Sequence, residues 1–147
     1  MKLVGLVALL LATGFCSAPD PMTAVVEGGG SHSASVAEAV QLVIKVTNTG
    51  PFIPHLVFVF RTPDRWFEVH RMTDLGGCTI AQEQSALDCG DLAKSESKTY
   101  SFQSIATTVG TFHYELALRE LVHPFNYVND HSDGADVLTW DETVSAT

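Results

Sequence analysis

Apolar and polar residues alternate with a period of two along much of the chain, as in β-strands that bury one face. The segment 40–47 places Val40, Leu42, Ile44 and Val46 on one face. The segment 112–118 alternates in the same way and is expected to turn His113 outward. The segment 56–60 is apolar on both faces, which predicts a core strand that is either covered on both sides or near an edge that a loop covers.

Further strands are expected at 22–27, 66–71, 98–102 and 137–144. The residues between them favour turns, because Thr47-Asn48-Thr49-Gly50-Pro51 combines a glycine with a proline, and because 28–33 is rich in glycine and serine. No segment has a convincing helical period. Seven or eight short strands separated by turns predict an all-β, immunoglobulin-like antiparallel β-sandwich.

The N-terminus has the pattern of a secretory signal peptide, because Lys2 is followed by a short apolar run that ends near Phe15. That run is shorter than the roughly 20 apolar residues that span a bilayer. We therefore expect a signal peptide at 1–18, an N-terminal strand with a flexible segment at 19–38, and the sandwich at 39–147. Cys16 offers a site for a lipid anchor, but Phe15 stands where lipoproteins normally have a small residue. Export would place the protein in the periplasm, on the cell surface or outside the cell, with no membrane insertion after cleavage.

The charge balance argues against a nucleic-acid partner. The chain has 17 acidic and 8 basic residues, which give a formal net charge of −9. A phosphate backbone would be repelled by this surface. The acidic residues are spread along the chain, as on a solvated surface.

Two cysteines remain beyond the N-terminal segment, Cys78 and Cys89. An even pair in an exported chain favours a disulfide, which would contribute roughly 2 to 3 kcal/mol by restricting the unfolded chain. The spacing is not that of a CxxC motif, and His70 has no second histidine at ligand spacing, so neither a redox motif nor a zinc site is indicated.

The six histidines raise the hypothesis of a metal site. Its candidate ligands are His113, His123, His131 and Asp133, which could meet only if the segment after the 112–118 strand folds back. The stretch 129–136 is rich in oxygen ligands, but the twelfth position of a helix-loop-helix calcium loop would be Trp140 instead of glutamate. A looser calcium site between loops and a plain polar turn both stay open, and no cofactor is predicted.

Catalytic residues are not indicated. No serine lies in a Gly-x-Ser-x-Gly motif, and bridged cysteines would leave no thiolate. Paired carboxylates such as Asp141 and Glu142 lie near strand ends, where solvation is their simplest role. Phe125 and Tyr127 lie in an expected loop, so they are candidate binding residues.

Several segments together resemble the "domain of unknown function eleven" family of immunoglobulin-like modules in prokaryotic surface proteins. The resemblance covers about 40–144 and includes 46–51, Gly77-Cys78, Leu87-Asp88-Cys89-Gly90-Asp91-Leu92, 98–102 and 109–111. It implies a turn that ends one strand, a cysteine pair that brackets a hairpin, and a surface location. The chain departs from the family in having one copy, in its loosely fitting segment 123–130, and in lacking a turn glycine at Lys94-Ser95.

These observations favour a non-catalytic exported module that contacts a protein or glycan at the cell envelope through its loops. A small periplasmic metal-binding protein, using histidines near the C-terminus, is the alternative hypothesis. A structural subunit that pairs through an open sheet edge is a third.

Overall fold

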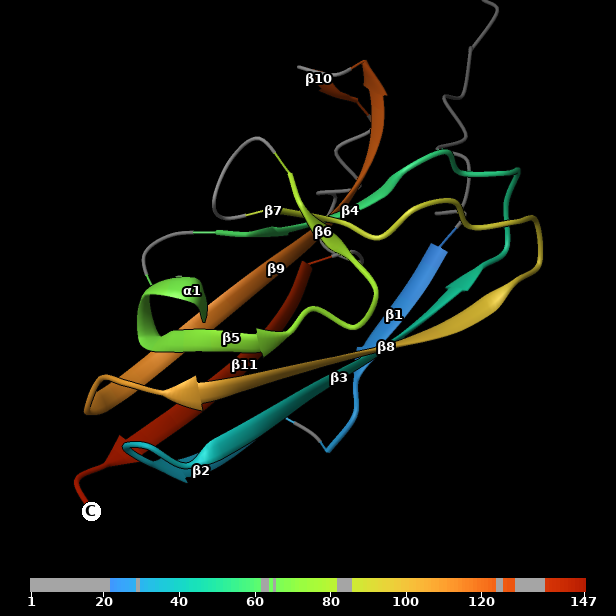
Figure 1. The fold of residues 1–147 in the computed structure, drawn as a ribbon. Helices are drawn as coiled ribbons and strands as arrows, with labels where there is room; N and C mark the ends of the chain where they lie inside the picture. Colours follow the sequence, from blue (N-terminus) through green and yellow to red (C-terminus); the bar gives the residue numbers. More distant parts are fainter. Residues whose placement is uncertain are drawn as a thin grey trace, which may run out of the picture.

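The protein is an all-β sandwich of two packed sheets, described here from a computed structural model (Figure 1). The structure describes residues 22–28, 30–61, 64, 66–81, 86–123, 126–128 and 137–147. Within this part of the chain, no helix has the length and apolar character needed to cross a membrane.

The smaller sheet has four strands, in the order β1 (Met22–Val26), β3 (Ala39–Asn48), β8 (Ser97–Ala106) and β5 (His70–Asp74). The larger sheet runs in the order β2 (Ser31–Ser35), β11 (Val137–Ser145), β9 (Gly110–His123), β4 (Leu56–Phe60), β7 (Ala86–Asp88) and β6 (Thr79–Ile80). A short strand, β10 (Asn126–Val128), pairs with the far end of β9. All pairings are antiparallel except that of β2 with β11. The two-sheet arrangement confirms the predicted immunoglobulin-like sandwich.

The first two strands belong to different sheets, because β1 pairs with β3 whereas β2 pairs with β11. The chain crosses between the sheets in the glycine-rich segment that follows Val26. Gly28 there has a φ of 94°, a conformation that glycine adopts without steric cost. The sequence suggested a polar connection as far as residue 33, but the structure begins β2 at Ser31.

The alternating segments bury the faces that their patterns predicted. Leu42, Ile44 and Val46 of β3 are fully buried. Phe58 of β4 packs edge-to-face against Tyr100 and Phe102 of the opposite sheet, with ring centroids 4.9 and 5.8 Å apart. Val57, on the other face of β4, is buried too, which confirms a core strand covered on both sides.

One predicted strand is wrong in its first half. Residues Trp66–Val69 form a single helical turn, α1, and the strand β5 begins only at His70. Trp66 and Val69 are both buried, at a spacing of three that a helical turn places on one face and a strand does not. The turn is held by Thr107, whose backbone N–H and hydroxyl both donate to the carbonyl of Val69.

One end of the sandwich is closed by contacts between segments that carry the family resemblance. Asn48 is fully buried, accepts a hydrogen bond from the N–H of Gly50 (2.9 Å) and donates to the carbonyls of Pro51 (2.6 Å) and Ala93 (3.0 Å). Ile53 and Leu92 bridge the same two segments through a reciprocal pair of backbone hydrogen bonds. The Thr-Asn-Thr-Gly-Pro turn is therefore fixed to the turn that precedes β8.

Candidate functional site

The disulfide predicted between Cys78 and Cys89 is confirmed. The two Cα atoms are 4.2 Å apart, and both residues are buried. Cys78 directly precedes β6 and Cys89 directly follows β7, and these strands pair with each other. The bridge therefore closes the open end of the β6–β7 hairpin, as the family resemblance implied.

The residues proposed for a metal site are not all within the described part of the chain. His113 is on the exposed face of β9, and His123 is the last residue of that strand. His131 and Asp133, and the loop residue Phe125, lie outside the described residues. Tyr127 lies in β10, opposite Leu121. Across the described ranges, no group of three or more His, Cys, Asp or Glu side chains could hold a metal ion.

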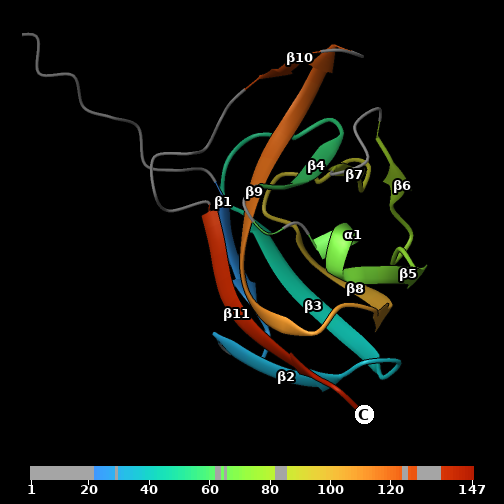
Figure 2. The same ribbon diagram turned by 90° about the vertical axis from the view of Figure 1, so that its left-hand side faces the viewer.

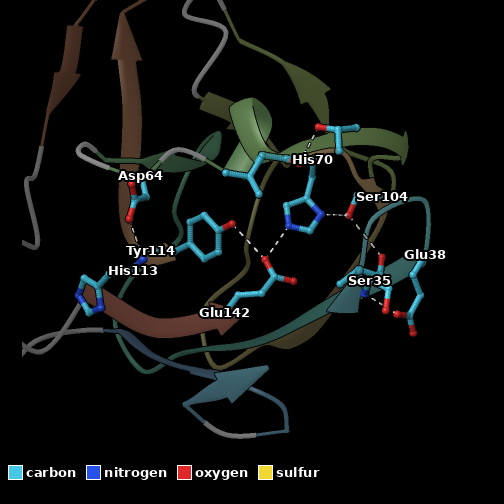
Figure 3. Close-up of polar contacts among 11 residues, drawn as sticks. Ser35, Glu38, Asp64, His70, Ser104, His113, Tyr114 and Glu142 are labelled. Carbon is cyan, nitrogen blue, oxygen red and sulfur yellow. Dashed lines mark hydrogen bonds and ion pairs between the residues drawn. The ribbon is translucent and has the colours of Figure 1, made fainter. Parts of the chain in front are cut away.

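A buried chain of polar side chains crosses from one sheet to the other in the core (Figure 3). At its centre, Nε2 of His70 lies 2.7 Å from Oε2 of Glu142, and both side chains are 0% exposed. His70 begins β5 of the smaller sheet, and Glu142 lies on β11 of the larger sheet. The pair thus joins the two sheets through the core.

Each member of the pair has a second hydrogen-bond partner. The hydroxyl of Tyr114, on β9, donates to the same carboxylate oxygen of Glu142 at 3.0 Å. The hydroxyl of Ser104, on β8, lies 3.0 Å from Nδ1 of His70 and 3.4 Å from the carbonyl of Val40. The four side chains come from four strands, two in each sheet. Their hydrogen bonds therefore fix how the two sheets pack.

Aromatic rings enclose this chain of contacts. The ring of Trp66 stacks on the imidazole of His70, with centroids 3.8 Å apart and planes 5° from parallel. Trp140 packs against both Trp66 and Tyr114. Burial, followed by the neighbouring charge of Glu142, raises the pKa of Tyr114 far above its ordinary value. The phenol is therefore neutral at neutral pH and donates its hydrogen bond.

Three buried polar atoms near this site have no hydrogen-bond partner in the described structure: Oε1 of Glu142 and the indole nitrogens of Trp66 and Trp140. A buried carboxylate oxygen without a partner costs free energy, of the order of 1–3 kcal/mol or more for a charged group. Only one oxygen of Glu142, the one shared by His70 and Tyr114, is satisfied. All the hydrogen bonds that the carboxylate makes within the described structure therefore come from His70 and Tyr114.

The connectivity Ser104–His70–Glu142 is that of a nucleophile, base and acid in hydrolases. The serine, histidine and glutamate are 1%, 2% and 1% exposed, however, so a substrate cannot reach the hydroxyl in this conformation. The arrangement is suited to holding the two sheets together, and these buried side chains offer no open catalytic surface.

The sequence-based interpretation of Glu142 as a solvated carboxylate is wrong. The alternation in 137–144 contained the information, because Glu142 is in phase with Trp140 and Val144, which are buried. Its partner, His70, lies 72 residues away in the sequence, and only the folded topology brings the two together.

A second histidine–carboxylate pair lies at the surface close by. Nδ1 of His113 is 2.7 Å from Oδ1 of Asp141, and the two side chains are 51% and 59% exposed. The backbone N–H of His113 also donates to Asp64 at 2.7 Å. The hydrogen bond that His113 donates to the Asp141 carboxylate is the main cause that raises the pKa of His113.

The end of the sandwich at Asn48 carries an exposed aromatic residue. Phe52, in the loop between β3 and β4, is 54% exposed. The first residue of β4, Leu56, is opposite Glu120, so this loop lies at the end of the sheet from which β9 continues to His123. Figure 2 shows β9 and β10 projecting past β4 at this end. Nearby, Nδ1 of His55 lies 2.9 Å from Oδ2 of Asp88.

Comparisons with known proteins support the fold. No family model matches the chain, and no curated protein is similar to it. The solution structure of the CARDB domain of PF1109 from Pyrococcus furiosus is similar, with a TM-score of 0.53 and 14% identity over 85% of this chain and 94% of that one. A crystal structure of the same domain in complex with di-metal ions gives a TM-score of 0.50 and 15% identity, covering 86% of this chain and 94% of that one. At this identity the likeness establishes an immunoglobulin-like fold and nothing more.

Proposed function

We propose that this protein is a non-catalytic, exported immunoglobulin-like module that binds a protein or glycan at the cell envelope. The observation that carries the proposal is that exposed Phe52 lies in a loop at the same end of the sandwich from which the β9–β10 pair projects. Loops and strand extensions at one end of a rigid sandwich are where immunoglobulin-like domains place their binding residues.

Three further features support this proposal. The Cys78–Cys89 disulfide suits an oxidising compartment outside the cytoplasm. The Ser104–His70–Glu142 arrangement is closed to a substrate. Two of the segments that resemble the "domain of unknown function eleven" family, 46–51 and 87–92, meet at the Asn48 end, and membership of that family of surface modules belongs to the same proposal.

The test uses the native cell with a photo-crosslinking amino acid at Phe52. Val109 offers a matched control, because it is 56% exposed but lies beside the opposite end of β9. We expect a specific adduct at the envelope from position 52 and none from position 109, and we expect Phe52→Asp to weaken binding of the captured partner. Equal labelling at both positions, or a protein confined to the cytoplasm, would contradict the proposal.

A further inference from the structure

The buried His70–Glu142 pair and the surface His113–Asp141 pair have the same separation but different surroundings. Both pairs join a histidine nitrogen to a carboxylate oxygen at 2.7 Å, and both involve β11. The surface pair can exchange protons with water on either side. The buried pair is enclosed by aromatic rings and has no exposed atom on either side chain.

The geometry limits how many protons the buried pair can hold. Oε2 of Glu142 already accepts from Tyr114, and when the carboxyl is ionised Nε2 of His70 donates to the same oxygen. One added proton is accommodated as an imidazolium beside a carboxylate. A second would neutralise the carboxyl and leave the imidazolium buried without a counter-charge, which is strongly destabilising.

The unfolded chain has no such limit. In acid, a solvated glutamate and a solvated histidine each bind a proton at about their ordinary values of 4.3 and 6.5. The unfolded state therefore binds two added protons where the folded state holds at most one. Because the unfolded state binds more protons, the free energy of unfolding falls as the pH falls.

The other groups around the pair do not relieve this constraint. Ser104 on β8, the carbonyl of Val40 on β3 and Trp66 on α1 do not ionise in acid. Tyr114 on β9 is the one further ionisable group hydrogen-bonded to the pair among the described residues, and it is a neutral phenol in acid. Asp64 and His113 lie on the exposed side of β9 and touch neither His70 nor Glu142 through any contact drawn in Figure 3.

We propose that His70 and Glu142 form an acid-sensitive latch, which holds the two sheets together at neutral pH and releases β5 from β11 when a second proton enters. The latch follows from the core alone and does not depend on the binding role proposed for the Phe52 end.

The test is the pH dependence of unfolding by denaturant, measured from neutral pH into acid. A variant with His70→Gln and Glu142→Gln has no ionisable group at either position, and two amides can still hydrogen-bond. In acid, we expect the unfolding equilibrium constant of the unsubstituted protein to rise more steeply than that of the double variant. The difference should be about tenfold per pH unit, because unfolding then takes up one more proton. Asp141→Asn removes the carboxylate of the surface pair. This variant should keep the steep pH dependence of unfolding, because its buried pair is intact.

A second variant protects the test against a double variant that does not fold. His70→Gln leaves Glu142 as a single buried carboxyl without a histidine partner. Below the ordinary glutamate pKa of about 4.3 this variant holds no imidazolium in its core, so its profile there should be as shallow as that of the double variant. Parallel profiles for the unsubstituted protein and either of these variants would overturn the latch.

Discussion

Three described residues other than glycine have a left-handed backbone, and two of them, Ala37 and Ser95, lie in turns with the same hydrogen bonding. Ala37 has a φ of 69° and Ser95 a φ of 62°. In each turn the glutamate one residue later reaches back, Glu38 to the N–H of Ser35 and Glu96 to the N–H of Ala93, both at 2.7 Å. The turn glycine that the resembling family has near Lys94-Ser95 thus corresponds to a real conformational need.

Replacing Ser95 by glycine should therefore stabilise the fold. The left-handed conformation costs an L-residue roughly 1–2 kcal/mol, and a glycine adds an entropic cost of roughly 0.5–1 kcal/mol in the unfolded chain. We expect Ser95→Gly to raise the free energy of unfolding by about 0.5–1 kcal/mol, as measured by chemical denaturation. Lys94→Gly, at the exposed neighbour whose φ is not positive, should lower it, and equal effects at both positions would contradict this account.

The surface histidine gives a prediction about pH. The hydrogen bond that His113 donates to the Asp141 carboxylate raises the pKa of His113 above its ordinary value. A histidine whose pKa is raised by folding stabilises the folded state below its unfolded pKa, and this contribution is lost as the pH rises through the folded pKa. An NMR titration should show His113 titrating above the ordinary range, and Asp141→Asn should move it back. The same pKa in both proteins would show that the pair does not persist in solution.

At the scale of elements, the β6–β7 hairpin relies on a covalent bond. The two strands have two and three residues, which is too short for a stable isolated ladder. The disulfide spans a sequence separation of 11 residues. On the loop-entropy model, replacing both cysteines by alanine should lower the free energy of unfolding by about 3 kcal/mol.

The matched control for this prediction is the unsubstituted protein with its disulfide reduced. Reduction should give nearly the same loss of stability as the alanine variant, because both remove the same constraint from the unfolded chain. A double variant as stable as the oxidised protein would show that the bridge does not contribute to the fold.

Strands with a regular alternation of apolar and polar residues could be predicted from the sequence. A single helical turn and a strand without apolar alternation could not. The alternation in β3, β4 and β11 located these strands within a few residues. It missed the end of β9, which continues from the predicted 112–118 to His123, and Tyr127 lies in β10 where a loop was expected. The turn at Trp66–Val69 was missed because four residues are too few to establish a helical period. The pairing of β2 with β11 was missed because a strand of serine, histidine and alanine has no apolar alternation.

At the scale of the whole molecule, the disulfide was predictable and the buried site was not. Two cysteines allow one pairing, so Cys78 and Cys89 needed no knowledge of the topology. The core site needs strands β5, β8, β9 and β11 to be placed in two facing sheets before His70 meets Glu142. The candidate metal-binding histidines of the sequence analysis, His113, His123 and His131, do not include the buried His70.

The proposed role at the envelope requires this disulfide-stabilised sandwich to act outside the cytoplasm. The most direct measurement is the intact mass of the protein recovered from its native envelope, taken after alkylation with and without prior reduction. We expect a chain without its N-terminal segment, in which Cys78 and Cys89 are alkylated only after reduction. A chain that retains the N-terminal segment, with both thiols alkylated without reductant, would contradict export and with it the proposed role at the envelope.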